Sequence, residues 1–88
     1  MPMTYEVQIK RQARRKLLGM PADLRIKIAE KIYRLGLNPD DPTLDIKPLE
    51  GRPYFRLRIG EWRIIFDRQD IIKLISIEKI GTRGDVYK

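Results

Sequence analysis

The chain has 88 residues, the length of one small domain, and its 42% hydrophobic and 35% charged residues suit a folded core rather than a disordered segment. Lys and Arg number 19 against 12 Asp and Glu, so the net charge of +7 favours a polyanion or an acidic protein as partner. There is no Cys or His, which excludes disulfide frameworks, Cys/His zinc sites, and catalysis by a thiol or an imidazole.

The N-terminal half predicts one strand followed by two helices. Tyr5, Val7 and Ile9 share one side of residues 4–10, the period of two that is typical of a half-buried strand. Residues 11–18 form a short basic helix in this prediction. A second helix over residues 22–36 follows, and Pro21 is well placed to open it, because a first-turn residue does not need its N–H. Its apolar stripe recurs at spacings of four, four and three and consists of Leu24, Ile28, Ile32 and Leu35.

A cluster of breakers, residues 39–42, ends the second helix around residues 36–38. Residues 44–49 then suit only an edge strand or irregular pairing, because they contain Pro48. The clearest signal follows. Residues 54–59 and 62–67 read as two strands joined by Gly60-Glu61, a type II′ hairpin. Residues 68–70 make the next turn, residues 71–77 supply a further β-branched strand, and residues 81–88 form a compact tail in this prediction.

The hairpin register divides its side chains between an apolar and a basic face. Six apolar groups share one side if these pairs lie opposite each other: Phe55 with Phe66, Leu57 with Ile64, and Ile59 with Trp62. The other side then carries Arg56, Arg58 and Arg63, with Arg58 directly opposite Arg63. Like charges placed opposite each other on a sheet are destabilising, and a bound phosphate would relieve the repulsion. The alternative is a solvated face whose Arg stems cover apolar surface.

Other features carry less specific signals. The basic run over residues 10–16 is typical of a solvated helix and could also contact nucleic acid. The carboxylates lack the spacing of a metal site, so we expect no metal and no cofactor. The first residues have no apolar core of a signal peptide, and the apolar runs are too short to cross a membrane, so we expect a cytoplasmic protein without a membrane partner.

The chain resembles the RelE/ParE superfamily of toxins from prokaryotic toxin-antitoxin modules. The resemblance runs through nearly all of it, as a single domain over residues 1–88. It is carried by the motifs Lys47-Pro48-Leu49-Glu50-Gly51, Tyr54-Phe55-Arg56-Leu57-Arg58-Ile59-Gly60-Glu61-Trp62-Arg63 and Gly81-Thr82-Arg83-Gly84-Asp85-Val86-Tyr87. The resemblance implies an α+β fold, a RelE-like microbial ribonuclease type, in which a curved antiparallel sheet carries two N-terminal helices on one face.

The resemblance also implies a function. RelE-like toxins are ribosome-dependent endoribonucleases that act without a metal and cleave mRNA in the A site through attack of the 2′-OH on the adjacent phosphate. Two alternatives remain open: a ParE-like inhibitor of DNA gyrase, and a non-catalytic RNA-binding or corepressor relative. The implied partners are the ribosome, mRNA, and a RelB-like antitoxin of acidic or amphipathic character. Operator DNA would be bound only through the antitoxin complex.

Roles carry over residue by residue. The catalytic positions implied by the resemblance are Arg56, Arg58, Arg63, Arg83 and Tyr87. Substrate binding is assigned to Lys47, Arg52 and Tyr54. Several relatives have Lys where this chain has Arg at 56 and 58, and a guanidinium does not readily accept a proton. The general base is therefore unassigned, with Lys47 as a candidate. Many relatives read Gly-His-Arg near the end, where this chain has Gly81-Thr82-Arg83.

Overall fold

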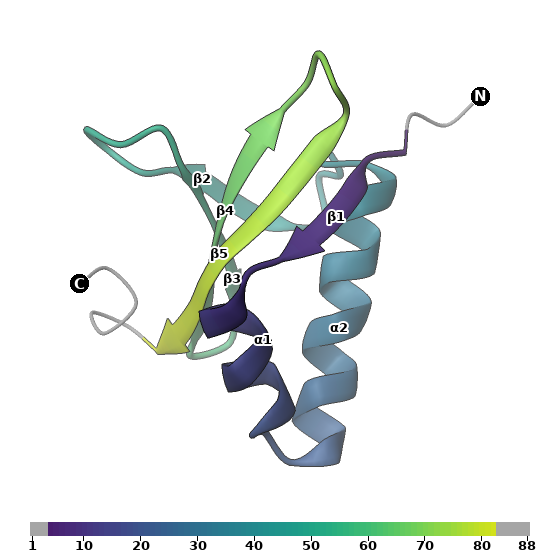
Figure 1. Cartoon of the computed structure of the whole chain (residues 1–88), viewed down its shortest axis with the longest axis vertical. Coiled ribbons are helices and arrows are strands. Elements are labelled where there is room, and N and C mark those ends of the chain that lie inside the picture. Colours follow the sequence, from purple (N-terminus) through teal and green to yellow (C-terminus); the bar gives the residue numbers. More distant parts are fainter. Residues whose placement is uncertain (1–3, 83–88) are drawn as a thin grey trace.

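The computed structural model describes residues 4–82, which form one five-stranded sheet and two helices (Figure 1). The chain order is β1 (Glu6–Ile9), α1 (Arg11–Leu18), α2 (Ala22–Leu37), β2 (Asp45–Pro48), β3 (Phe55–Ile59), β4 (Trp62–Gln69) and β5 (Leu74–Thr82). The spatial order of the strands is β1-β5-β4-β3-β2. The predicted α+β class, the two N-terminal helices and the strand at the edge over residues 44–49 are confirmed.

The sheet is antiparallel among β2, β3, β4 and β5, as expected, whereas β1 joins the other edge in parallel with β5. The paired residues are far apart in the sequence: Val7, for example, lies beside Ile75. The crossover between them includes both helices and three strands. The sheet is therefore mixed, because β5 runs parallel to β1 on one side and antiparallel to β4 on the other.

Both helices begin and end where the sequence signals predict. Pro21 precedes the first turn of α2, Asp23 lies in that turn, and the helix stops before Asn38 and Pro39. Its last turn is anchored to the sheet by the amide of Tyr5, which donates to the carbonyl of Gly36 over 2.7 Å. A Cβ at Gly36 would come within 2.7 Å of Val7 Cγ2, so a larger residue at this position would require the Val7 side chain to shift.

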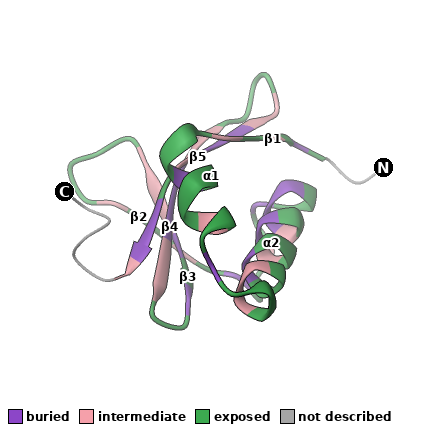
Figure 2. Cartoon of the chain, turned by 60° about the horizontal axis from the view of Figure 1, so that its bottom comes forward, coloured by how far each residue is buried: buried purple, intermediate pink, exposed green. Residues whose placement is uncertain are grey.

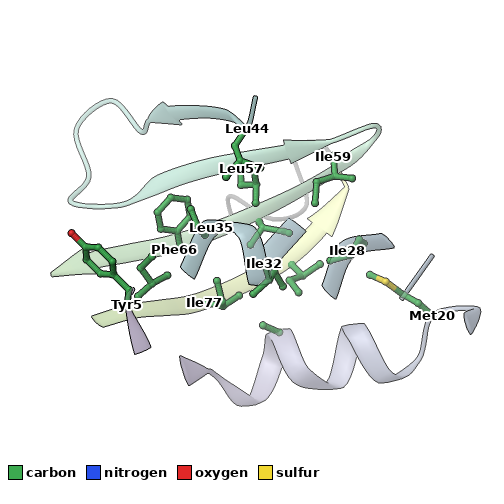
Figure 3. Close-up of a cluster of buried hydrophobic side chains, with 14 residues drawn as sticks. Tyr5, Met20, Ile28, Ile32, Leu35, Leu44, Leu57, Ile59, Phe66 and Ile77 are labelled. Carbon is green, nitrogen blue, oxygen red and sulfur yellow. The ribbon is translucent and has the colours of Figure 1, made fainter. Parts of the chain in front are cut away.

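The core fills the space between the two helices and one face of the sheet (Figure 3). In that view Ile28, Ile32 and Leu35 of α2 point toward strand residues such as Phe66 and Ile77. Phe66 is 1% exposed and its ring stacks on Phe55, with centroids 5.6 Å apart. The outer surfaces of both helices are exposed (Figure 2). The predicted apolar side of the hairpin is thus the core side.

The predicted hairpin register is confirmed: Ile59 lies opposite Trp62, Leu57 opposite Ile64, and Phe55 opposite Phe66. Gly60, the first central residue of the turn, has a positive φ of 58°, and the φ of Glu61 is not positive. A type II′ turn requires this combination. The turn chemistry and the apolar alternation therefore specify the same register.

Two boundaries of the last strand differ from the prediction. β4 continues to Gln69, so the turn before β5 contains Ile71 and Ile72, which are 99% and 62% exposed. The strand then runs on to Thr82, beyond the predicted end at Ile77. The β-branched pair Ile71-Ile72 favours a strand, but Lys73 closes the turn with a φ of 53°. The pairing with β4 and β1 begins at Leu74.

Candidate functional site

The face of the sheet opposite the helices carries a group of cations that we call the basic face. Arg56 and Arg58 of β3 and Arg63 of β4 alternate with core residues and therefore project from this side. Lys47 of β2 lies opposite Arg56, and Lys79 of β5 lies opposite Ile65. Four adjacent strands thus supply five cations, and three of them are the arginines that the sequence placed together.

Arg58 and Arg63 form the centre of the basic face. They lie directly opposite each other on β3 and β4. Both turn toward the hairpin turn: Arg63 Nη1 donates to the carbonyl oxygen of Gly60 over 3.0 Å, and Arg58 Nε donates to the same oxygen over 3.4 Å. Within residues 4–82, no carboxylate forms an ion pair with either side chain. Two adjacent positive charges are held together here by a neutral acceptor, an arrangement that an anionic ligand would stabilise.

Arg56 is in a different state from its two neighbours. Its Nη2 donates to Oδ1 of Asp45 over 3.0 Å, its side chain is only 13% exposed, and its buried Nε finds no partner among the described residues. Asp45 is on β2, directly opposite Arg58 of β3. Its carboxylate nevertheless pairs with Arg56, the diagonal neighbour, rather than with Arg58. The predicted catalytic position of Arg56 is on the basic face, but its charge is balanced by Asp45, a residue the sequence did not single out.

The substrate-binding candidates frame this face on the β2 side. Lys47 is exposed on β2. Tyr54 is half-buried just before β3, where its carbonyl accepts from the amide of Leu49, and its alternation with Phe55 places it on the basic side. Arg52 is exposed in the loop between β2 and β3. Arg83 and Tyr87, the two C-terminal candidates, lie outside the described residues.

Lys79 is the cation that sequence reasoning missed. The predicted strand ends at Ile77, because Ile80 does not continue the alternation of Ile75 and Ile77. Across residues 4–82, no three His, Cys, Asp or Glu side chains gather in a way that could hold a metal ion. The described helices also include none that is long and apolar enough to cross a membrane.

A groove of about 430 Å³ lies away from the basic face, between β1 and α2. Its lining is mainly apolar and includes Val7, Ile9, Ile32 and Tyr33. It offers no cluster of charged groups, so it does not suit a phosphate or a proton-transfer reaction. This groove is therefore not an extension of the basic face.

A second charged cluster ties the loop after α2 to the end of β4. Arg68 donates from Nη1 to Asp40 over 2.8 Å and from Nε to Asp70 over 2.7 Å. The hydroxyl of Tyr5 also donates to Asp70, over 2.8 Å. The hydrogen bonds from Arg68 hold the pKa of Asp40 and of Asp70 below the ordinary value of 3.8. This cluster joins three distant segments and is structural in character.

The Arg68 cluster predicts how stability depends on pH. A carboxyl whose pKa is lowered by folding stabilises the protein above its unfolded-state pKa near 4, and this stabilisation is lost as the pH falls through the folded-state value. We expect Arg68→Met to lower the melting temperature at pH 7 and to bring it closer to that of wild type at pH 2. Melting curves followed by circular dichroism from pH 7 to pH 2 test this. An equal difference at every pH would contradict it.

Comparison with known proteins relates the whole chain to a family. No known family profile matches the chain. RelE1 of Methanocaldococcus jannaschii is 32% identical over 88 residues, 98% of both chains. The RelE-RelB complex from Pyrococcus horikoshii contains a chain of 30% identity, with a TM-score of 0.80 over 93% of this chain and 98% of that one.

A more distant structure has the same fold. The toxin-antitoxin complex RelBE2 from Mycobacterium tuberculosis includes a chain with a TM-score of 0.76 at 22% identity, covering 97% of this chain and 98% of that chain. This likeness concerns the fold alone, whereas the comparison with RelE1 covers 98% of the chain at 32% identity. Because the sequence is 32% identical to RelE1 over 98% of the chain, and the fold agrees with that of the Pyrococcus horikoshii chain over 93% of it, the chain belongs to the RelE family of toxins.

Proposed function

We propose that this chain is the toxin of a toxin-antitoxin module and that it inhibits translation by cleaving mRNA bound in the ribosomal A site. The observation that carries the proposal is the Arg58–Arg63 pair on the basic face, two facing cations without a carboxylate partner among residues 4–82. A phosphodiester supplies the missing anion, and a guanidinium fork binds its oxygens bidentately.

The proposed reaction needs charge stabilisation and two proton transfers. The ribose 2′-oxygen forms a bond to phosphorus while the bond from phosphorus to the 5′-oxygen breaks. The 2′-OH loses its proton to a base and the 5′-oxygen gains one, which gives a 2′,3′-cyclic phosphate and a free 5′-OH. Arg58 and Arg63 stabilise the additional negative charge on the phosphorane in this scheme. The resemblance adds Arg83 and Tyr87 as further catalytic candidates, and Lys47 is the candidate for the base.

The experiment is inducible expression in a bacterial host with primer extension on a translated reporter mRNA. We expect cuts at codon-phased positions that require translation of the reporter. An untranslated version of the same reporter, with its start codon removed, is the matched control. Growth arrest with intact mRNA and an induced DNA-damage response would favour a gyrase inhibitor instead. Absence of arrest would favour a binding-only relative.

We also infer a RelB-like antitoxin as the cognate partner, on the strength of the RelE-RelB complex that the Pyrococcus horikoshii relative forms. The net charge of +7 favours an acidic or amphipathic chain that covers the basic face. Electrostatic steering then predicts that the association rate constant falls at least 10-fold between 0.05 and 0.5 M NaCl, roughly the lower end of the steering effect. Surface plasmon resonance measures this rate, and a salt-independent rate would contradict the charge argument.

A further inference from the structure

The basic face is arranged in two rows that run across the strands. The first row, from β2 to β5, consists of Asp45, Arg58, Arg63 and Gly81. The second row consists of Lys47, Arg56, Ile65 and Lys79. The rows are two residues apart along each strand, which corresponds to about 7 Å. This separation is comparable with that of neighbouring phosphates along a single RNA strand.

A β-bulge places Lys79 on this face. Phe66 lies opposite Ile77 but Ile65 lies opposite Lys79, so Glu78 is an extra residue without a facing partner on β4. Ile77 and Ile80 are both fully buried in the core despite being three residues apart. Strict alternation would have turned one of them outward. The bulge reconciles them and leaves Lys79 exposed on the opposite side.

The two rows offer different groups to a ligand. In the first row, β5 supplies only Gly81 opposite Arg63, so no side chain stands beside the arginine pair on that strand. The next β5 side chain on the same face is that of Lys79, a diagonal neighbour of Arg63 at about 7 Å between their backbones. In the second row Arg56 is balanced by Asp45, and Ile65 is 4% exposed and uncharged. Lys79 is the cation that β5 contributes to this second row.

We propose that Lys79 binds the RNA phosphate next to the one held by Arg58 and Arg63, which makes it a further substrate-binding residue. The ammonium group of a lysine is a compact charge with three donors, which suits a phosphate that is positioned rather than transformed. RNA would then follow the strand direction from the first row to the second, past the bulge. This inference rests on the proposed function, because it extends the same RNA site.

The test compares Lys79→Met, which keeps the length of the aliphatic stem, with Lys79→Arg, which keeps the charge. The matched control is Lys27→Met, which removes one exposed lysine from α2, away from the basic face. The probe is a fluorescein-labelled 2′-O-methyl RNA oligonucleotide, which lacks the nucleophilic hydroxyl. Fluorescence anisotropy at several salt concentrations gives the affinity and its salt dependence. Circular dichroism melting checks that each variant is folded.

We expect Lys79→Met to bind about 5-fold more weakly at 0.1 M salt and to reduce the slope of log K against log salt by about 0.7, the value for one contact to a single strand. Lys79→Arg should restore both quantities, and Lys27→Met should match wild type. If Lys79→Met behaves like Lys27→Met while Arg58→Ala weakens binding, the role of Lys79 is overturned and the proposed function stands. If wild type does not bind the oligonucleotide, or if none of these variants changes binding, the RNA site itself is overturned.

Discussion

Replacing Arg58 by Ala is expected to lower the rate of mRNA cleavage by about 10² to 10³, the usual effect of removing one group that stabilises transition-state charge. Arg63→Ala should have an effect of the same size. At the centre of the basic face Arg58 is exposed and Arg63 is half-buried, and their hydrogen bonds go to the backbone carbonyls of Gly60 and Trp62 rather than to an acid. Their removal therefore takes charge away from the substrate without leaving a buried carboxylate unpaired.

The measurement is single-turnover cleavage of mRNA on purified programmed ribosomes. Lys27→Ala is a suitable control, because it removes an exposed cation from α2, on the other side of the sheet. Arg58→Lys separates charge from geometry, since a lysine keeps the charge but cannot form the bidentate pair. Wild-type rates in both Arg58→Ala and Arg63→Ala would remove the basis for assigning the reaction to this face. A loss in Lys27→Ala of similar size would indicate a non-specific charge effect.

Truncation of Phe66 is expected to have the largest effect on stability. Phe→Ala changes in a core cost about 3 to 5 kcal/mol, because the transfer free energy of the ring is lost and a cavity remains. Phe66 is 1% exposed, stacks on Phe55, and belongs to the layer between β4 and the helices. Small domains are stable by about 5 to 15 kcal/mol, so this loss approaches the lower end of the total.

Urea denaturation followed by circular dichroism gives the free energy of unfolding for this comparison. Ile71→Ala is the matched control, because it also truncates a large apolar residue of the β4–β5 hairpin but at a site that is 99% exposed. Its expected effect is within about 0.5 kcal/mol. Similar losses for Phe66→Ala and Ile71→Ala would contradict the assignment of the core to the helix side of the sheet.

Most of the local architecture follows from patterns within ten or so residues. The alternation of Phe55, Leu57 and Ile59, together with Gly60 at the turn, specifies the hairpin register, and that register alone puts Arg58 opposite Arg63. The limits of α2 follow from Pro21 and Pro39 in the same way. The central pair of the candidate site could therefore be predicted, since it depends on contacts between residues close in sequence.

Features that depend on long-range pairing could not be predicted in this way. The parallel pairing of β1 with β5 joins Val7 to Ile75, and no local pattern in either strand specifies a partner so far along the chain. The ion pairs of Arg68 with Asp40 and of Arg56 with Asp45 also join different segments. A charged residue in a sequence indicates neither its partner nor its burial.

Lys79 shows how local and long-range effects combine. Its neighbours Ile77 and Ile80 are both apolar, so alternation in β5 alone assigns at most one of them to the core. Only packing against the helices buries both, and the sheet accommodates this by bulging at Glu78. The alternating pattern was thus enough to predict that this protein has a basic face. Which cations complete that face, and which of them an acid balances, was decided by the three-dimensional packing, because both depend on strands that meet only after folding.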